Sequence, residues 1–212
     1  MSLPLILIGA GGHAKVLLET LRAQGKPIIG LLDNDPATSG RVVFGAAVLG
    51  GDEVLAGHDP ARTSLVNAVG AVADAKARRA VYERFRAMGF GFAGVVNASA
   101  VLASGVELGQ GAQVLAGAVV QTGTAIGENA VINTRAGVDH DCVIGAHAHI
   151  APGATLCGNV IVGEAAVVGA GATVIQGIRL GPGCLVAAGA VVVADVGAGE
   201  QVRGVPARCV KR

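Results

Sequence analysis

The second half of the chain has a hydrophobic pattern that repeats every six residues. From Val96 to Val192, the first position of seventeen consecutive hexads is always Val, Ile or Leu. The fifth position of each hexad is small or aliphatic, and most often Ala. A period of six fits neither an amphipathic helix nor an alternating strand. It indicates a solenoid in which each hexad forms one flat side, with positions one and five facing inward.

Glycine is frequent at the second position of the hexads, where we expect the backbone to turn with positive φ. This frame resembles the hexapeptide-repeat transferases, whose left-handed parallel β-helix has three hexads in each coil. The resemblance implies that residues eighteen apart stack on the same side of the prism. A purely structural prism without activity is the alternative. The second-position glycines are Gly109, Gly127, Gly145, Gly163, Gly169 and Gly181.

Residues 1–93 follow a different pattern, which predicts a small Rossmann-like α/β domain. A buried-type strand at 5–8 leads into the glycine turn Gly9-Ala10-Gly11-Gly12, and a helical pattern follows directly. A second strand at 28–32 ends in Asp33-Asn34, which completes a βαβ unit with a turn suited to a phosphate. A third strand is expected at 65–70 and a second helix at about 73–88. Residues 94–212 are assigned to the β-helix and a C-terminal tail.

The glycine turn of this domain leaves three interpretations open. It could hold a nucleotide diphosphate, it could belong to an NAD site, or it could serve only close strand-to-helix packing. Fewer than a hundred residues make only half of a doubly wound dinucleotide domain, which favours the nucleotide diphosphate over NAD.

Composition and net charge limit the partners and the compartment that we expect for the protein. The net charge is +1, so no general field attracts the chain to nucleic acid. No segment approaches the ~20 uninterrupted apolar residues of a spanning helix, so we expect no membrane insertion. The N-terminus reads as a first strand rather than a signal peptide. The four cysteines lack paired or metal-type spacing, which favours free thiols and a cytoplasmic protein.

The hexad frame places His140 third and His149 sixth in their hexads, so both are expected to project from the prism surface. Asp139 and Asp141 flank His140. A carboxylate bonded to one ring nitrogen makes the other more basic, as a general base requires. Gly158 lies eighteen residues beyond His140 and is expected ~4.8 Å above it, where it leaves room for a thioester and could turn its N–H toward an oxyanion.

Two other interpretations of the histidines remain open. A histidine between two aspartates is often only a solvated surface group. His140, His147 and His149 could instead belong to a zinc site like that of γ-class carbonic anhydrases. That site needs a third ligand far upstream on the prism, and the sequence offers none there, so we expect no metal.

Five segments together resemble one family across nearly the whole chain. They are the turn Gly9-Ala10-Gly11-Gly12-His13-Ala14, the strand end Leu32-Asp33-Asn34, the hexad prism, the stretch 133–145 from Asn133-Thr134 through Asp139-His140-Asp141, and the tail Gly204-Val205-Pro206-Ala207-Arg208. The chain resembles the NeuD/PglD-like sugar acetyltransferases. Within them it looks most similar to the nucleotide-4-amino-sugar N-acetyltransferases, such as those acting on GDP-perosamine or on the UDP-linked bacillosamine precursor.

The resemblance implies a role for particular residues of this chain. His140 would be the catalytic base and Asp141 the acid that strengthens it, where relatives often have Glu. Ala188 replaces a glycine of some relatives, so its contact would involve only backbone. The implied acetyl-CoA contacts are His149, Gly158, Ala170 and Ala188. The implied nucleotide-sugar contacts are Gly11, Gly12, His13, Asp33, Asn34, Gly70 and Asn133.

The resemblance also implies a homotrimer with active sites between subunits, acetyl-CoA as co-substrate, and a nucleotide-amino-sugar acceptor used in lipopolysaccharide O-antigen synthesis. The amine would attack the thioester directly. O-acetylation of a sugar or sialic acid hydroxyl is the alternative within the class. A non-catalytic nucleotide-sugar-binding or structural β-helix protein is the alternative outside it.

Overall fold

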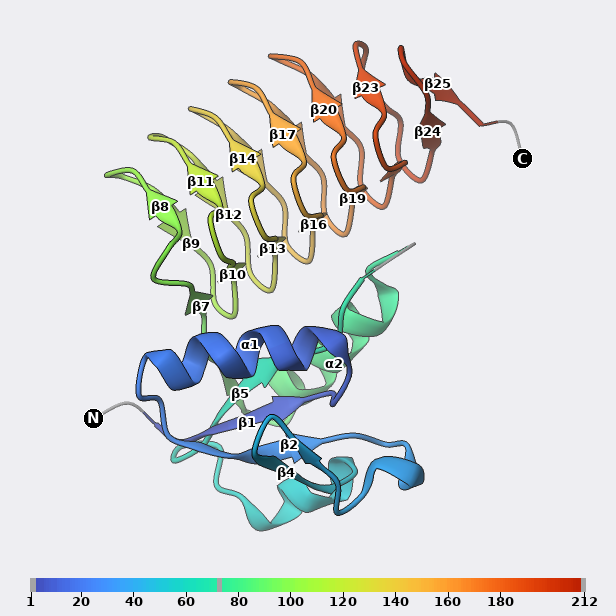
Figure 1. Ribbon diagram of the computed structural model, residues 1–212. Helices are drawn as coiled ribbons and strands as arrows, with labels where there is room; N and C mark the ends of the chain where they lie inside the picture. The colour runs from blue at the N-terminus through green and yellow to red at the C-terminus, as the bar shows by residue number, and fades with distance from the viewer. Residues whose placement is uncertain (1–2, 72–73, 211–212) are drawn as a thin grey trace.

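The computed structural model describes residues 3–71 and 74–210, which form an N-terminal α/β domain followed by a β-helical prism (Figure 1). The N-terminal sheet has the strand order β3-β4-β2-β1-β5-β6, in which only β3 and β4 pair antiparallel. The elements are β1 Leu5–Ile8, α1 Gly12–Ala23, β2 Ile28–Leu32, η1 Pro36–Thr38, β3 Val42–Val43, β4 Ala46–Gly50, η2 Asp52–Gly57, β5 Ser64–Asn67, α2 Lys76–Ala87 and β6 Gly91–Phe92.

The predicted Rossmann-like arrangement is confirmed, with shifts at its edges. The third strand ends at Asn67 rather than 70, and α2 ends one residue before the predicted 88. The predicted helix start at Ala73 lies outside the described residues. The sequence pattern did not reveal the β3–β4 hairpin, because two- and five-residue strands beside Gly45 and Gly50 give no clear alternation.

The hexads form a left-handed parallel β-helix with one two-residue strand in each hexad. Each strand pairs with the strand one coil away at an offset of eighteen residues, as in Gly137↔Thr155. The strands are β7 Val95–Val96, β8 Val101–Leu102, β9 Glu107–Leu108, β10 Gln113–Val114, β11 Val119–Val120, β12 Ala125–Ile126, β13 Val131–Ile132, β14 Gly137–Val138, β15 Val143–Ile144, β16 His149–Ile150, β17 Thr155–Leu156, β18 Ile161–Val162, β19 Val167–Val168, β20 Thr173–Val174, β21 Arg179–Leu180, β22 Leu185–Val186 and β23 Val191–Val192.

Three flat sheets make the sides of the prism, and we name them by their strands. The first contains β7, β10, β13, β16, β19 and β22. The second contains β8, β11, β14, β17, β20 and β23, and the third contains β9, β12, β15, β18 and β21. The last coil is shorter, because β24 Gln201–Arg203 pairs with β22 at an offset of sixteen residues. β25 Arg208–Cys209 then folds back antiparallel on β24 and ends the prism.

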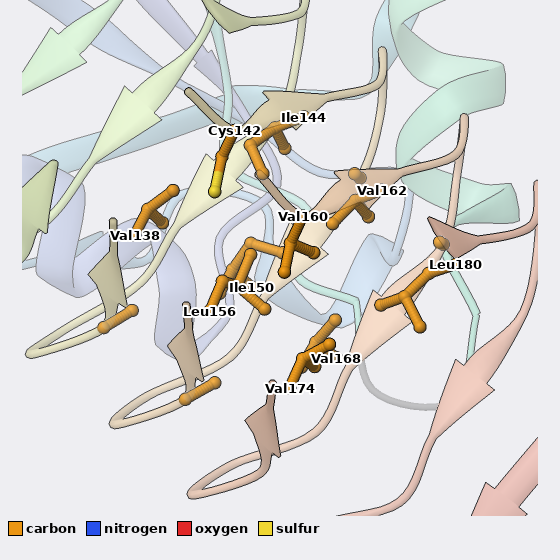
Figure 2. Close-up of a cluster of buried hydrophobic side chains, with 14 of the residues drawn as sticks. Val138, Cys142, Ile144, Ile150, Leu156, Val160, Val162, Val168, Val174 and Leu180 are labelled. Carbon is orange, nitrogen blue, oxygen red and sulfur yellow. The ribbon is translucent and has the colours of Figure 1, made fainter. Parts of the chain in front are cut away.

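The inward positions of the frame form the prism core, as predicted (Figure 2). First-position residues such as Val138, Ile150 and Leu156 meet fifth-position residues such as Cys142 and Val160, and all five are at most 1% exposed. The coil at the open end is less covered. Burial of apolar area stabilises a fold in proportion to the area buried. The continuous column of apolar side chains is therefore the main source of the prism's stability.

The second-position glycines have a different role from the predicted one. None of them has positive φ; the left-handed backbone occurs instead at the fourth position, as at Asp141 and Asn159. A Cβ on Gly127 would lie 2.6 Å from the Ala146 nitrogen, and one on Gly145 2.7 Å from the Glu164 nitrogen. Glycine is therefore needed because the next coil passes too close for a side chain.

The N-terminal domain packs on the first sheet of the prism. Leu17, Leu18 and Leu21 of α1 share one buried cluster with Leu115 and Val131 of the prism. Figure 1 shows the domain on the side of the prism that carries β10, β13, β16 and β19. The corner between the second and third sheets, which includes residues 139–142, therefore lies away from this domain. No helix of the described residues is long and apolar enough to cross a membrane.

Candidate active site

A cleft of about 680 Å³ lies between the N-terminal domain and the prism. Its N-terminal wall is formed by residues of the α1 start and of the loop after β5, including Gly12, His13 and Gly70. Its prism wall comes from the first sheet and the adjoining corner. Seven of the predicted contact residues line this one cleft: Gly12, His13, Gly70, Asn133, His149, Ala170 and Ala188.

His13 joins the two walls. It lies in the first turn of α1, and its Nε2 is 2.8 Å from Oε1 of Gln113 on β10. Gln113 donates from Nε2 to the Asn67 carbonyl at 2.8 Å, so its oxygen must face the ring, and the ring must donate from Nε2. Burial and then the Arg78 charge lower the pKa of His13 to about 4, so the imidazole is neutral.

His149 lies outside the prism core, as its hexad position predicts, but it is buried rather than surface-exposed, because the N-terminal domain covers it. Asn133 accepts from the Thr134 N–H and faces His149 Nε2 with its amide nitrogen at 3.3 Å. The ring hydrogen is therefore on Nδ1, for which no acceptor is found among the described residues. Burial above all, with help from Arg78, lowers the pKa of His149 to about 3.

The glycine turn and the end of β2 form a second group. Gly11 precedes α1, and a Cβ on Gly11 or Gly12 would meet nothing within 4 Å, so the turn is open. Asp33 accepts from the Ala10 N–H at 2.9 Å and so braces this turn. Asn34 exchanges two hydrogen bonds with Asp52. Asp33 and Asn34 line a hollow beside β1 and β2 that is separate from the interdomain cleft.

His140 and Asp141 form a hydrogen-bonded pair at the exposed corner between the second and third sheets. Their Nδ1 and Oδ2 atoms are 2.8 Å apart, and the two side chains are 51% and 58% exposed. Because the carboxylate can only accept, Nδ1 carries the hydrogen, and in the neutral ring Nε2 keeps its lone pair. The hydrogen bond to Asp141 is the main reason that the pKa of His140 is raised.

Two glycines give this pair its room. Gly158 lies one coil above His140, as predicted, and a Cβ there would come within 2.6 Å of Cε1 and Nε2 of the ring. The open space over Gly158 is thus filled by the imidazole itself, not left for a thioester. The Gly158 N–H has no backbone acceptor among the described residues. One coil below Asp141, Gly123 similarly leaves space for the carboxylate.

The predicted site residues therefore form separate groups in the structure. His140, Asp141 and Gly158 do not line the cleft that His13 and His149 share. His140, His147 and His149 also lie at different corners and sides of the prism and do not converge. No group of three or more potential metal ligands occurs within residues 3–71 and 74–210.

The sequence pattern missed several residues of the site. Gly123 could have been found, because it precedes Asp141 by eighteen residues. Gln113 occupies the sixth position of its hexad, which faces outward. That position alone does not indicate a contact with His13. Arg78, Asn67 and Asn129 form a buried network beside the cleft. They gave no signal, since the hydrogen bonds that join Arg78 and Asn67 to Asn129 span 51 and 62 residues of sequence.

Comparisons with known proteins agree with this architecture. Residues 4–85 match the family described as PglD N-terminal domain. Residues 123–158 match the bacterial transferase hexapeptide, and residues 159–194 match the hexapeptide repeat of succinyl-transferase. No curated protein matches the sequence at a significant level.

Several solved structures are similar over the full length. The acetyltransferase domain of PglB from Neisseria gonorrhoeae is 37% identical, with a TM-score of 0.91, and the match covers 99% of this chain and 100% of that one. PerB from Caulobacter crescentus, solved with CoA and GDP-perosamine, is 39% identical, with a TM-score of 0.90 and complete coverage of both chains. WeeI from Acinetobacter baumannii is 27% identical, with a TM-score of 0.87 and coverage of 99% and 100%.

These matches extend over both domains, and two of them exceed 30% identity. The chain belongs to the NeuD/PglD-like family of hexapeptide-repeat sugar acyltransferases.

Proposed function

We propose that the protein transfers the acetyl group of acetyl-CoA to the amino group of a nucleotide-linked 4-amino-4,6-dideoxy sugar, such as GDP-perosamine. The observation that carries the proposal is the His140–Asp141 hydrogen bond at an exposed corner, which leaves Nε2 of the neutral ring free to accept a proton. The full-length similarity to PerB, solved with CoA and GDP-perosamine, supports the choice of substrates. A variant of that perosamine N-acetyltransferase with a histidine replaced by asparagine, also solved with both ligands, is 38% identical to this chain.

In the proposed reaction, the sugar amine attacks the thioester carbonyl directly. The C–N bond forms, the C–S bond breaks, and the amine proton passes to Nε2 of His140. The resulting imidazolium is stabilised by Asp141 and returns the proton to the departing CoA thiolate. The free Gly158 N–H would stabilise the oxyanion, since it has no backbone acceptor among the described residues.

The two substrates would occupy the residues assigned to them above. The open turn at Gly11 and Gly12, with His13, Asp33, Asn34, Gly70 and Asn133, would hold the nucleotide sugar. The prism wall would hold acetyl-CoA through His149, Ala170 and Ala188, and Gly158 would contact it beside His140. The Ala170 and Ala188 N–H groups have no backbone acceptors within the described ranges, which suits backbone contacts to the cofactor.

A site between chains follows from this arrangement. The cleft opens beside the first sheet, whereas His140 lies at the corner of the prism farthest from that sheet. A sugar amine held in the cleft of one chain would therefore need His140 of a second chain. We propose the homotrimer that this requires, with the second and third sheets near His140 covered by neighbours. Val119 and Val143, 37% and 47% exposed, are apolar residues on these two sheets.

We keep the expectation of a cytoplasmic protein, because all four cysteines are free thiols, as in a reducing compartment. Lipopolysaccharide O-antigen synthesis is the proposed use of the product.

The proposal is tested by incubating the protein with acetyl-CoA and a panel of GDP-, UDP- and dTDP-linked 4-amino-4,6-dideoxy sugars. Each is paired with the matching 4-hydroxy sugar. We expect CoA release with at least one amino sugar, and a product carrying an amide-linked acetyl group by mass spectrometry and NMR. Acetylation of only the hydroxy sugars would establish the O-acetyltransferase alternative. If no acceptor of either kind is acetylated, the protein would instead be a non-catalytic nucleotide-sugar-binding protein.

A further inference from the structure

Arg78 is a fully buried cation without a carboxylate partner. It lies in α2 and is 0% exposed, and none of the ion pairs found among the described residues includes it. Burial lowers the pKa of Arg78 to about 9, which leaves it charged at neutral pH. A buried charge is costly unless hydrogen bonds compensate it. Its position therefore calls for a role beyond the formation of α2.

The hydrogen bonds of Arg78 join a loop of the N-terminal domain to the prism. Its Nη1 donates to the carbonyls of Asn67 and Val69, each at 2.9 Å. These residues end β5 and begin the loop that carries Gly70 and Ala71 into the wall of the cleft. Its Nε donates to the Asn129 carbonyl at 3.2 Å, in a corner turn of the prism. One guanidinium thus fixes the loop and the prism to each other.

The same network reaches the imidazole of His13. The Asn67 carbonyl accepts from both Arg78 and Gln113, and Gln113 holds His13 on its other end. Asn67 also donates to Asn129 Oδ1 at 3.1 Å, so a second bond parallels the Arg78 bridge. Burial above all, and then the Arg78 charge, opposes protonation of His13 and His149, so both rings keep their neutral tautomers.

We propose that Arg78 is a positioning residue that sets the N-terminal wall of the cleft, Gly70 and the His13 ring, for the nucleotide-linked sugar. This inference rests on the proposed function for the identity of that ligand. The acetyl-CoA residues lie on the prism, which Arg78 contacts at Asn129, outside the lining of the cleft. Loss of Arg78 should therefore weaken sugar binding much more than acetyl-CoA binding.

The test compares Arg78→Met and Arg78→Lys with Arg79→Met. Arg79 is the matched control, because it is next in the same helix and also reaches the prism, through Glu164 at 2.6 Å, but at the surface. In Arg78→Met we expect the KM for the nucleotide sugar to rise at least about tenfold, with kcat and the KM for acetyl-CoA within about twofold. In Arg79→Met all three constants should stay near those of the wild type.

Lysine could serve the carbonyls of Asn67 and Val69 but not also that of Asn129, so Arg78→Lys should give an intermediate KM for the sugar. An Arg78→Met protein that is less stable yet has an unchanged sugar KM would overturn the proposal. So would equal changes in both KM values, which indicate a purely structural role. If Arg78→Met does not fold, Arg78→Lys decides in the same way.

A readout without turnover separates this inference from the proposed function. Nitrogen NMR of histidine-labelled protein should show His13 as the Nε2–H tautomer in the wild type and in Arg79→Met. It should show a mixture of tautomers in Arg78→Met. An unaltered His13 tautomer in folded Arg78→Met would contradict the inference, whether or not any amino sugar is acetylated by the wild type.

Discussion

Replacing His140 with Asn is expected to lower kcat by about 10²–10⁴-fold, which is the usual contribution of a positioned general base. The asparagine amide can still donate to Asp141, but it cannot accept the amine proton. Because the His140 side chain is 51% exposed, its loss should leave the fold, the oligomer and acetyl-CoA binding intact. Steady-state kinetics, size-exclusion chromatography and calorimetry with CoA measure these three properties. Retained turnover in a folded variant would remove His140 from the mechanism.

The same pair should leave a signature in the pH–rate profile. A general base works only when it is unprotonated, and Asp141 holds the pKa of His140 above its ordinary value of 6.5. Activity of the wild type should therefore rise with pH through a midpoint above 6.5. In Asp141→Asn this midpoint should move to lower pH, and the maximal rate should fall because the imidazolium loses its partner. A midpoint that stays in place would show that another group titrates.

Replacing Gly158 with Val is the second change with a large expected effect. A Cβ at this position would lie 2.6 Å from Nε2 of His140, so the ring must leave its place over the glycine. A displacement of about 1 Å can cost about 10²-fold in rate, and we expect a loss of at least that size in kcat.

Gln176→Val is the matched control for Gly158→Val. Gln176 is exposed and occupies the same corner one coil further from His140. This control should keep its rate and stability. A Gly158→Val protein with wild-type kcat would show that the seat of the ring over Gly158 is not used in catalysis.

The prism could be predicted in detail because its repeat is local and strict. A period of six fixes which side chains face inward, and the offset of eighteen fixes which residues stack. Thus Val138 in the core, His140 at a corner and Gly158 above it all follow from one count along the chain. The outward direction of His149 follows from the same count.

Other features could not be predicted because they depend on contacts between distant segments. The frame gave no reason to expect His149 to be buried, since the covering residues belong to the other domain. The second-position glycines were assigned the wrong cause, because sequence alone does not distinguish positive φ from a close approach of the next coil. No sequence pattern indicates the role of Arg78, since the carbonyls that it binds lie at the end of β5, in the loop after β5 and in a corner turn of the prism.

In the proposed function, the cleft of one chain and His140 of a neighbouring chain form each active site together. This arrangement is tested by co-assembling two variants that are each expected to be inactive. One carries His140→Asn with an intact cleft, and the other carries Ala170→Trp, which would fill the cleft and leave His140 intact. Different affinity tags allow trimers that contain both chains to be purified.

Each such mixed trimer should hold one competent site, formed by the cleft of the His140→Asn chain and His140 of its neighbour. We therefore predict recovery of about one third of the wild-type activity, since a cyclic trimer with two kinds of chain has one such junction in three. Mixed trimers as inactive as either parent, with parents that remain folded, would contradict a site built between chains.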